Sequence, residues 1–224
     1  MISVPRVTYA LIAINVVAFL TEQGQFTIYG SSIHGKVIEE GVLWRYGISV
    51  EHQYWRLVSS AFLHESILHI GFNMYLLYLL GMMLEPALGS VRFAAIYTTA
   101  LLAGSFGALL ATAAPSLGAS GAVFGLMGAA AVELRARGLS IMQSGIGGLI
   151  LINLIFSFAV PNISVGAHIG GLIAGALAGL VFRAASTQRP RYSLALGLAG
   201  CGVLCAVSVV GSLLAATATA PGFA

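Results

Sequence analysis

A serine and a histidine stand out in this chain because each lies near the start of an apolar segment. Ser120 follows Gly118 and Ala119 at the head of one segment, and His168 has the matching place in a later one. Serine with histidine is a pair used in nucleophilic catalysis, in which the imidazole takes the hydroxyl proton and the oxygen attacks. Polar side chains of this kind are costly inside a membrane and are usually functional there. The two residues therefore predict acyl-transfer chemistry in lipid.

The acidic residues limit what can assist that pair. The chain has 224 residues and seven acidic ones, and all seven are glutamate. Because aspartate is absent, a Ser-His-Asp triad is excluded, and the chemistry must use a Ser-His pair or a glutamate. Cys201 and Cys205 lie four apart in one apolar run and are interpreted as packing residues, not as a disulfide or a metal site.

The composition indicates a membrane protein. The chain is 58% hydrophobic and only 8% charged, whereas soluble chains average about 25% charged residues. We expect an all-α polytopic helix bundle that forms a single domain over residues 1–224. The net charge of +3 comes from basic residues scattered at segment ends, without a patch, so no nucleic-acid partner is predicted.

Apolar runs of roughly 20 residues mark the membrane spans. Seven are expected, in two groups: a core of six within residues 1–184 and one further helix after it. The predicted spans are 5–21, 59–83, 92–113, 119–134, 145–161, 166–184 and 193–216. Residues 22–58 form the long connection between the first two, and their mixture of aromatic and basic side chains predicts a loop embedded at the membrane interface.

The basic residues orient these spans. With a cytoplasmic N-terminus, the inner side receives Arg6, Arg92, Arg135, Arg137, Arg183, Arg189 and Arg191. The outer side receives Lys36, Arg45 and Arg56, all in the long loop. This bias follows the positive-inside rule. The N-terminal run has no plausible cleavage site and is interpreted as a retained span, and the lack of a transit-like segment favours a bacterial inner membrane.

This topology brings polar side chains from three spans to one depth near the outer side. Ser120 and His168 meet His69 and Asn73, which lie in the outer half of the second span. His69 and Asn73 are about 40° apart on a helix and share a face, whereas His64 is about 140° from His69 and need not face the same site. Taken singly, each of these residues is also compatible with ordinary packing.

Glycines follow both candidate catalytic residues at helical spacing. Gly121 and Gly125 follow Ser120, and Gly171, Gly175 and Gly179 follow His168. Such small-xxx-small ridges let two helix backbones approach closely, although they are also common packing motifs. Close packing of the fourth and sixth spans would bring the hydroxyl within hydrogen-bond reach of the imidazole.

Ser120 also lies where a loop becomes a helix. The first N–H groups of a helix have no internal partner and can stabilise an oxyanion. His69 and Asn73 are candidate side-chain donors to the same oxygen. Nucleophile, base and anion stabiliser would then come from three spans.

Over about residues 50–180 the chain resembles the rhomboid family of intramembrane serine proteases. Five segments carry the resemblance, in the family's order and spacing: Tyr54-Trp55-Arg56, His64 with His69 and Asn73, Glu85 with Gly89-Ser90, Gly118-Ala119-Ser120-Gly121, and Ala167-His168 with Gly171 and Gly175. The resemblance implies a rhomboid-like six-helix core, and residues 193–216 would be an additional helix found in part of the family.

The resemblance also implies roles for the site residues. Ser120 would be the nucleophile, His168 the general base, and His69, Asn73 and the backbone N–H of Ser120 the oxyanion site. His64 would have a supporting role.

One further position departs from part of the family. Phe124 stands where some members have a tyrosine under the base histidine, and a phenylalanine can still stack on the imidazole. We therefore expect activity to survive the change.

The implied substrates are single-pass transmembrane proteins that enter from the bilayer, by a route expected between the second and fifth spans. No metal or organic cofactor is implied. The sequence names neither a particular substrate nor an oligomeric state. Two alternatives to a protease are an inactive relative and a transporter. An inactive relative binds membrane proteins but usually lacks the serine or the histidine, and a transporter would show inverted repeats, broken helices or mid-membrane charges, none of which the sequence has.

Overall fold

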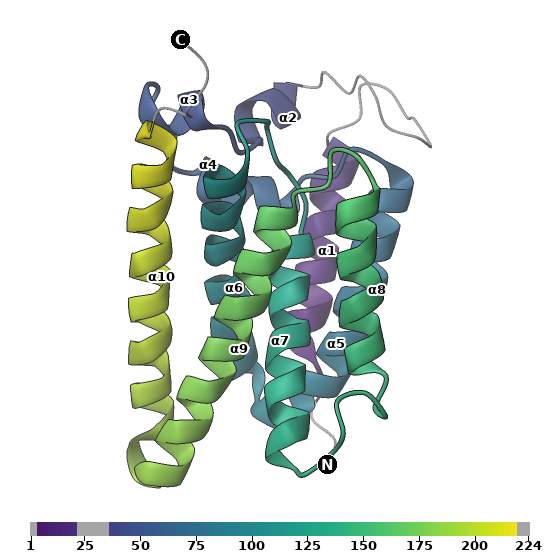
Figure 1. Cartoon of the computed structure of the whole chain (residues 1–224), viewed down its shortest axis with the longest axis vertical. Helices are drawn as coiled ribbons and strands as arrows, with labels where there is room; N and C mark the ends of the chain where they lie inside the picture. The colour runs from purple at the N-terminus through teal and green to yellow at the C-terminus, as the bar shows by residue number, and fades with distance from the viewer. Residues whose placement is uncertain (1–3, 22–35, 219–224) are drawn as a thin grey trace.

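The computed structural model describes residues 4–21 and 36–218, and its regular elements there are all helices (Figure 1). Seven long helices form the bundle: α1 (Arg6–Thr21), α5 (Ile67–Leu88), α6 (Ser90–Ala111), α7 (Ser120–Ala136), α8 (Ile146–Ala159), α9 (Val165–Gln188) and α10 (Ser193–Thr217). Three short helices, α2 (Lys36–Gly41), α3 (Arg45–Ser49) and α4 (Arg56–Ser59), belong to the long loop, whose residues 22–35 lie outside the described part.

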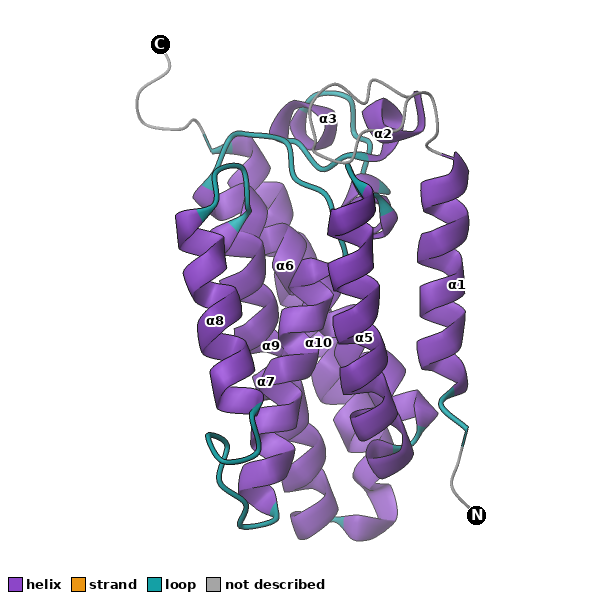
Figure 2. Ribbon diagram, turned by 90° about the vertical axis from the view of Figure 1, so that its right-hand side faces the viewer, coloured by secondary structure: helices purple, strands orange, loops and turns teal. Residues whose placement is uncertain are grey.

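The bundle is built to cross a membrane. Among the described residues, α5, α6, α9 and the stretch Pro190–Thr217 are each long and apolar enough to span a bilayer, and α1 and α8 are apolar but shorter. The long helices run side by side along one direction, with α2 and α3 across one end (Figure 2). The predicted all-α membrane bundle is confirmed.

The second predicted span differs from the structure at both ends. It was expected over residues 59–83, but α5 runs from Ile67 to Leu88. The hydroxyl of Ser66 accepts a hydrogen bond from the backbone N–H of His69 and caps the helix there. The helix ends before Gly89, whose φ of +85° suits glycine. An apolar run does not reveal the first of these boundaries, because most of residues 59–65, which precede α5, are themselves buried or half-buried.

The centre of the bundle is held by glycines that bring helix backbones together. A Cβ added to Gly171 of α9 would overlap the carbonyl oxygen of Gly121 in α7, and one on Gly175 would overlap that of Gly125. Gly107 of α6 and Gly166 of α9 exclude a side chain from each other in the same way. The helix α9 therefore lies directly against two neighbours with backbone facing backbone.

The helix α1 is anchored on α5 by a buried carboxylate. Glu85 is 1% exposed, and its oxygens accept hydrogen bonds from the backbone N–H groups of Val7 and Thr8, at 2.9 and 2.8 Å. The hydroxyls of Thr8 and Ser90 donate to the same carboxylate, at 2.7 and 2.6 Å. A negative charge at the start of a helix satisfies free N–H groups and favours the helix dipole.

The long loop is folded around two arginines. Arg56 is 3% exposed and donates to the carbonyl oxygens of Glu39 and Val42, each at 2.8 Å, which holds α2 against α4. Burial lowers the pKa of Arg56, and the charges of Glu51 and Glu40 oppose that shift.

Arg45 ties the same loop to the ends of two long helices. Its guanidinium donates to the carbonyl oxygen of Leu109, at 2.6 Å, and to that of Ala218, at 2.9 Å. The last carbonyls of a helix have no internal partner, and a cation there also favours the dipole. Arg45 thus joins the end of α6 to the end of α10.

We predict that Gly171→Leu lowers the free energy of unfolding by about 3 kcal/mol or more, because the new side chain must push α7 and α9 apart. Thermal unfolding of the purified protein in detergent measures the change. Gly202→Leu is the matched control, because a Cβ at Gly202 meets nothing within 4 Å. Equal unfolding temperatures for the two variants would show that the α7–α9 contact tolerates a side chain.

Candidate active site

The two candidate catalytic residues lie within hydrogen-bond distance of each other. His168 Nε2 is 2.8 Å from Ser120 Oγ, although the residues are 48 positions apart. Ser120 is the first residue of α7, and His168 lies in the first turn of α9, so the α7–α9 glycine contact fixes their separation. His168 is 7% exposed and Ser120 is half-buried. The geometry is that of a hydroxyl in contact with a base.

Phe124 lies beneath the histidine ring. The two ring centroids are 4.2 Å apart and the planes differ by 14°, so the rings are stacked. Phe124 comes four residues after Ser120, one turn further along α7. One helix therefore carries both the hydroxyl and the surface on which the imidazole rests.

The other nitrogen of His168 has a partner that the sequence analysis did not identify. Ser157 Oγ of α8 lies 2.6 Å from His168 Nδ1, and Ser157 is 2% exposed. The sequence did carry a signal, because Asn153 and Ser157 are polar residues four apart in an otherwise apolar span. Without knowing how α8 is rotated, however, that face could not be assigned to the histidine.

The hydrogen bonds of Ser157 select one tautomer of His168. The Ser157 hydroxyl donates its single hydrogen to the carbonyl oxygen of Asn153, at 2.7 Å. Because a carbonyl cannot donate, Ser157 Oγ must accept from His168, and the ring proton of the neutral imidazole therefore lies on Nδ1. Nε2 is then free to accept the proton of Ser120. This is the tautomer that a general base requires.

The loop before Ser120 packs against two histidines. Gly118 has a φ of +117°, and a Cβ there would lie 2.7 Å from His69 Nε2, so both conformation and space require glycine. His64 and His69 stack edge to face with centroids 5.0 Å apart. The backbone N–H of Ala119 points to His64 Nε2 over a long 3.5 Å.

The placement of His64 corrects the helical-wheel argument. His64 precedes α5, which begins at Ile67, so its direction does not follow the helical period. It is fully buried behind the loop that carries Ser120. His64 is thus close to His69 without sharing a helix face with it.

The candidate oxyanion donors are differently disposed. His69 Nδ1 is buried without a hydrogen-bond partner among the described residues, so it can take one. The amide nitrogen of Asn73 donates to the carbonyl oxygen of His69, at 2.9 Å, and one of its two hydrogens is thereby used. No described hydrogen bond joins either side chain to Ser120. Since α7 begins at Ser120, the first N–H groups of that helix have no partner within it.

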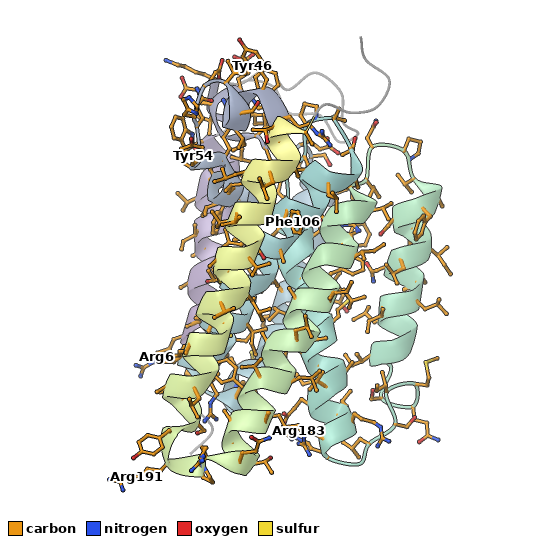
Figure 3. The ribbon with its side chains drawn as sticks, turned by 60° about the vertical axis from the view of Figure 1, so that its left-hand side comes forward. Arg6, Tyr46, Tyr54, Phe106, Arg183 and Arg191 are labelled. Atoms are coloured by element: carbon orange, nitrogen blue, oxygen red, sulfur yellow. The ribbon has the colours of Figure 1, made fainter. Side chains whose placement is uncertain are left out.

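Three arginines and two tyrosines mark opposite ends of the molecule. Arg6, Arg183 and Arg191 lie at one end, and Tyr46 and Tyr54 of the long loop lie at the other (Figure 3). The loop connecting α6 to α7, which leads to Ser120, lies at the end that carries α2 and α3 (Figure 1). Within the described residues there is no group of three or more His, Cys, Asp or Glu side chains arranged to hold a metal.

Comparison with known proteins finds sequence similarity to rhomboid proteins. The sequence model of the Rhomboid domain matches residues 51–185. Rhomboid protease GluP of Bacillus subtilis (strain 168) is 36% identical over 174 residues, which are 76% of this chain and 34% of that protein. Putative rhomboid protease YdcA of the same organism is 32% identical over 162 residues, which are 67% of this chain and 80% of that protein.

Not all of the similar proteins are named as proteases. Inactive RHOMBOID-like protein 8 of Arabidopsis thaliana is 33% identical over 139 residues, 59% of this chain and 39% of that protein. The chain thus spans well under half the length of GluP and of the inactive relative. The domain match begins at residue 51 and ends at residue 185, so it leaves out α1, α2, α3 and α10.

Proposed function

This chain belongs to the rhomboid family, and from that premise we propose that it is an intramembrane serine endopeptidase that uses a Ser120–His168 dyad. The observation that carries the proposal is the 2.8 Å contact between Ser120 Oγ and His168 Nε2, with the proton of His168 assigned to Nδ1. The chain is an integral, multi-pass membrane protein, so this chemistry takes place in or near the bilayer.

The proposed reaction is acyl transfer in two stages. Ser120 Oγ attacks the scissile carbonyl carbon while its proton passes to His168 Nε2, which gives a tetrahedral oxyanion. His168 then protonates the leaving nitrogen, the C–N bond breaks and an acyl-enzyme remains. A water molecule, deprotonated by His168, hydrolyses the ester and restores Ser120.

The oxyanion would be stabilised from two directions. The backbone N–H of Ser120, at the start of α7, and the positive end of the α7 dipole would stabilise the oxygen of the reacting carbonyl. His69 has an unused buried nitrogen, and Asn73 has one amide hydrogen left. We assign both side chains as donors that engage once a substrate oxygen is present, with His64 and Gly118 holding the loop that carries Ser120.

The proposed substrates are single-pass transmembrane proteins. A spanning helix uses its carbonyls in internal hydrogen bonds, so a substrate must unwind locally before Ser120 can reach a peptide carbonyl. We propose entry between α5 and α8, because α8 buries only Ile146 and Ser157 and is the least buried of the long helices described. We propose that the N-terminus is cytoplasmic and that the dyad lies towards the outer side, which the arginine distribution supports. A bacterial inner membrane is the proposed location.

The first test is labelling with a fluorophosphonate probe, which reacts with activated serines. We expect the wild-type protein to be labelled, Ser120→Ala to be unlabelled, and His168→Ala to react roughly 100-fold more slowly, as loss of a general base implies. His52→Ala is the control, because His52 lies in the exposed loop beside Tyr54. If folded wild-type protein is neither labelled nor able to cleave a single-pass substrate in lipid, the inactive, client-binding function replaces this proposal.

The second test concerns Ser157 as a positioning residue. We predict that Ser157→Ala lowers kcat roughly tenfold and has little effect on KM. A roughly tenfold change in rate corresponds to the net free energy of about one hydrogen bond. Ser157→Thr keeps the hydroxyl and should restore most of the rate. Ser208→Ala is the matched control, since Ser208 is a buried serine bonded to the carbonyl of Leu204 and remote from the dyad.

A structural role alone would give a different pattern for Ser157. In that case Ser157→Ala would lower the unfolding temperature, and the rate of fluorophosphonate labelling per folded molecule would stay at the wild-type value. We expect the labelling rate to fall in parallel with kcat, because the small probe needs the base but not the substrate site.

The third test concerns the ring beneath the base. We predict that Phe124→Ala lowers turnover severalfold because the imidazole loses the surface that orients it, whereas Phe124→Tyr retains turnover. Turnover in detergent is the measurement. Phe106→Ala removes a ring of equal size from the contact between α6 and α10 and serves as the control. Unchanged turnover in Phe124→Ala would remove this role from Phe124.

A further inference from the structure

A groove of about 570 Å³ opens on the bundle between α7, α8 and α9. Its volume lies within the roughly 300–1,000 Å³ of small-molecule sites. All but two of its lining residues are glycine, alanine or branched aliphatic side chains, among them Val132, Ile150, Leu172 and Leu180. Neither Ser120 nor His168 lines it.

The groove exists because α8 packs only loosely beside α7 and α9. Those two helices touch directly at Gly128, where an added Cβ would overlap the carbonyl oxygen of Leu172. The open space therefore lies between this pair and α8, over the small side chains of Ala131 and Ala176. The helix α8 spans only 14 residues, and the exposed connection before it carries Ile141, which forms part of the wall. An apolar channel between helices is therefore open to the hydrocarbon of the bilayer.

The two exceptions in the lining are Arg135 and Arg183. Arg135 lies in the last turn of α7 and Arg183 lies on α9, at the same end of the molecule as Arg6 and Arg191 (Figure 3). The pair thus marks the arginine-bearing end of the groove. Two guanidinium groups beside one apolar channel suit a ligand with an anionic head and a hydrocarbon tail.

No carboxylate neutralises these two arginines within the described residues. Glu133 is the nearest acidic residue in sequence, and its carboxylate is paired with Arg137 at 2.6 Å. Glu85 is occupied by the start of α1 and by Ser90. Arg135 and Arg183 take part in none of the ion pairs that the described residues make.

We propose that this groove binds one anionic phospholipid from the leaflet at the arginine-bearing end. The phosphate lies between Arg135 and Arg183, and one acyl chain lies along the apolar channel. Guanidinium groups bind phosphate oxygens in paired hydrogen bonds, and basic pockets between membrane helices are suited to anionic headgroups. A zwitterionic lipid such as phosphatidylcholine carries the same phosphate, but the two arginines would repel its ammonium group, which lowers its affinity relative to an anionic lipid. A free phosphate ion would leave the channel unused.

The bound lipid would brace α8. Its acyl chain contacts Ile150 of α8 and Leu172 of α9 together, and so fills the space that the helices leave open. Lipid binding should therefore raise the unfolding temperature as well as show selectivity for headgroup charge. This proposal does not depend on proteolysis, since both readouts are independent of activity.

Native mass spectrometry of the full chain tests the proposal. The protein is mixed with equal amounts of phosphatidylglycerol and phosphatidylcholine that carry the same acyl chains. We expect wild-type protein to retain one phosphatidylglycerol molecule in preference to phosphatidylcholine. In the double variant Arg135→Gln/Arg183→Gln, the ratio of bound phosphatidylglycerol to bound phosphatidylcholine should fall roughly tenfold or more. Unfolding temperatures with each lipid should follow the same order.

The matched control is Arg189→Gln/Arg191→Gln. It removes the same charge from the same end of the molecule, but neither residue lines the groove. The control should keep the wild-type preference. Equal retention of the two lipids by wild-type protein, or an equal loss in both double variants, would overturn the proposal because the attraction would then be absent or diffuse.

A third arm separates a lipid site from a simple anion site. Inorganic phosphate added at millimolar concentration should not displace the phospholipid, because it has no chain for the channel. Val132→Trp, which narrows the channel and keeps both arginines, should weaken phosphatidylglycerol binding at an unchanged unfolding temperature of the lipid-free protein. Displacement by phosphate, or full binding by folded Val132→Trp, would show that the channel takes no part.

Discussion

The backbone contact between α7 and α9 is the constraint on which the candidate site depends. Gly171 and Gly175 lie against the carbonyl oxygens of Gly121 and Gly125, and no larger residue fits at these positions. Ser120 is next to Gly121, and His168 is three residues before Gly171, so the contact sets their separation directly. In a membrane, where lipid is as apolar as any side chain, such close packing is a main source of helix association.

Around this contact, a short series of polar groups crosses three helices. It runs from Ser120 to His168, on to Ser157, and ends at the carbonyl oxygen of Asn153. Each donor has an acceptor, so burial leaves none of these groups unsatisfied. In this series a neutral serine stands where a triad would have a carboxylate. A buried carboxylate without full compensation would be costly here, whereas a hydroxyl orients the imidazole at little cost.

The two ends of the bundle are held together by different interactions. At one end, Arg45 and Arg56 fold the long loop and tie it to α6 and α10, above the helices that carry the site. At the other end, Glu85 anchors α1, and unpaired arginines line an apolar groove. The helix α10 lies against α6 and α9, outside the part of the chain that matches the family. Its position is that of a brace on the outer side of the two helices that hold the centre together.

The sequence by itself determined the class of fold, the number of long helices and the family, because apolar length, charge placement and a spaced set of motifs are all local to the chain. It also singled out Ser120, His168 and their glycine ridges, whose roles remain proposals. What it missed depends on rotation and on non-helical backbone. The start of α5 at Ile67, the closeness of His64 to His69, and the Ser157–His168 contact were decided only when the helices packed. A lone serine in an apolar span has no preferred face until its neighbours are in place, and for this reason tertiary structure alone assigned Ser157 to the histidine.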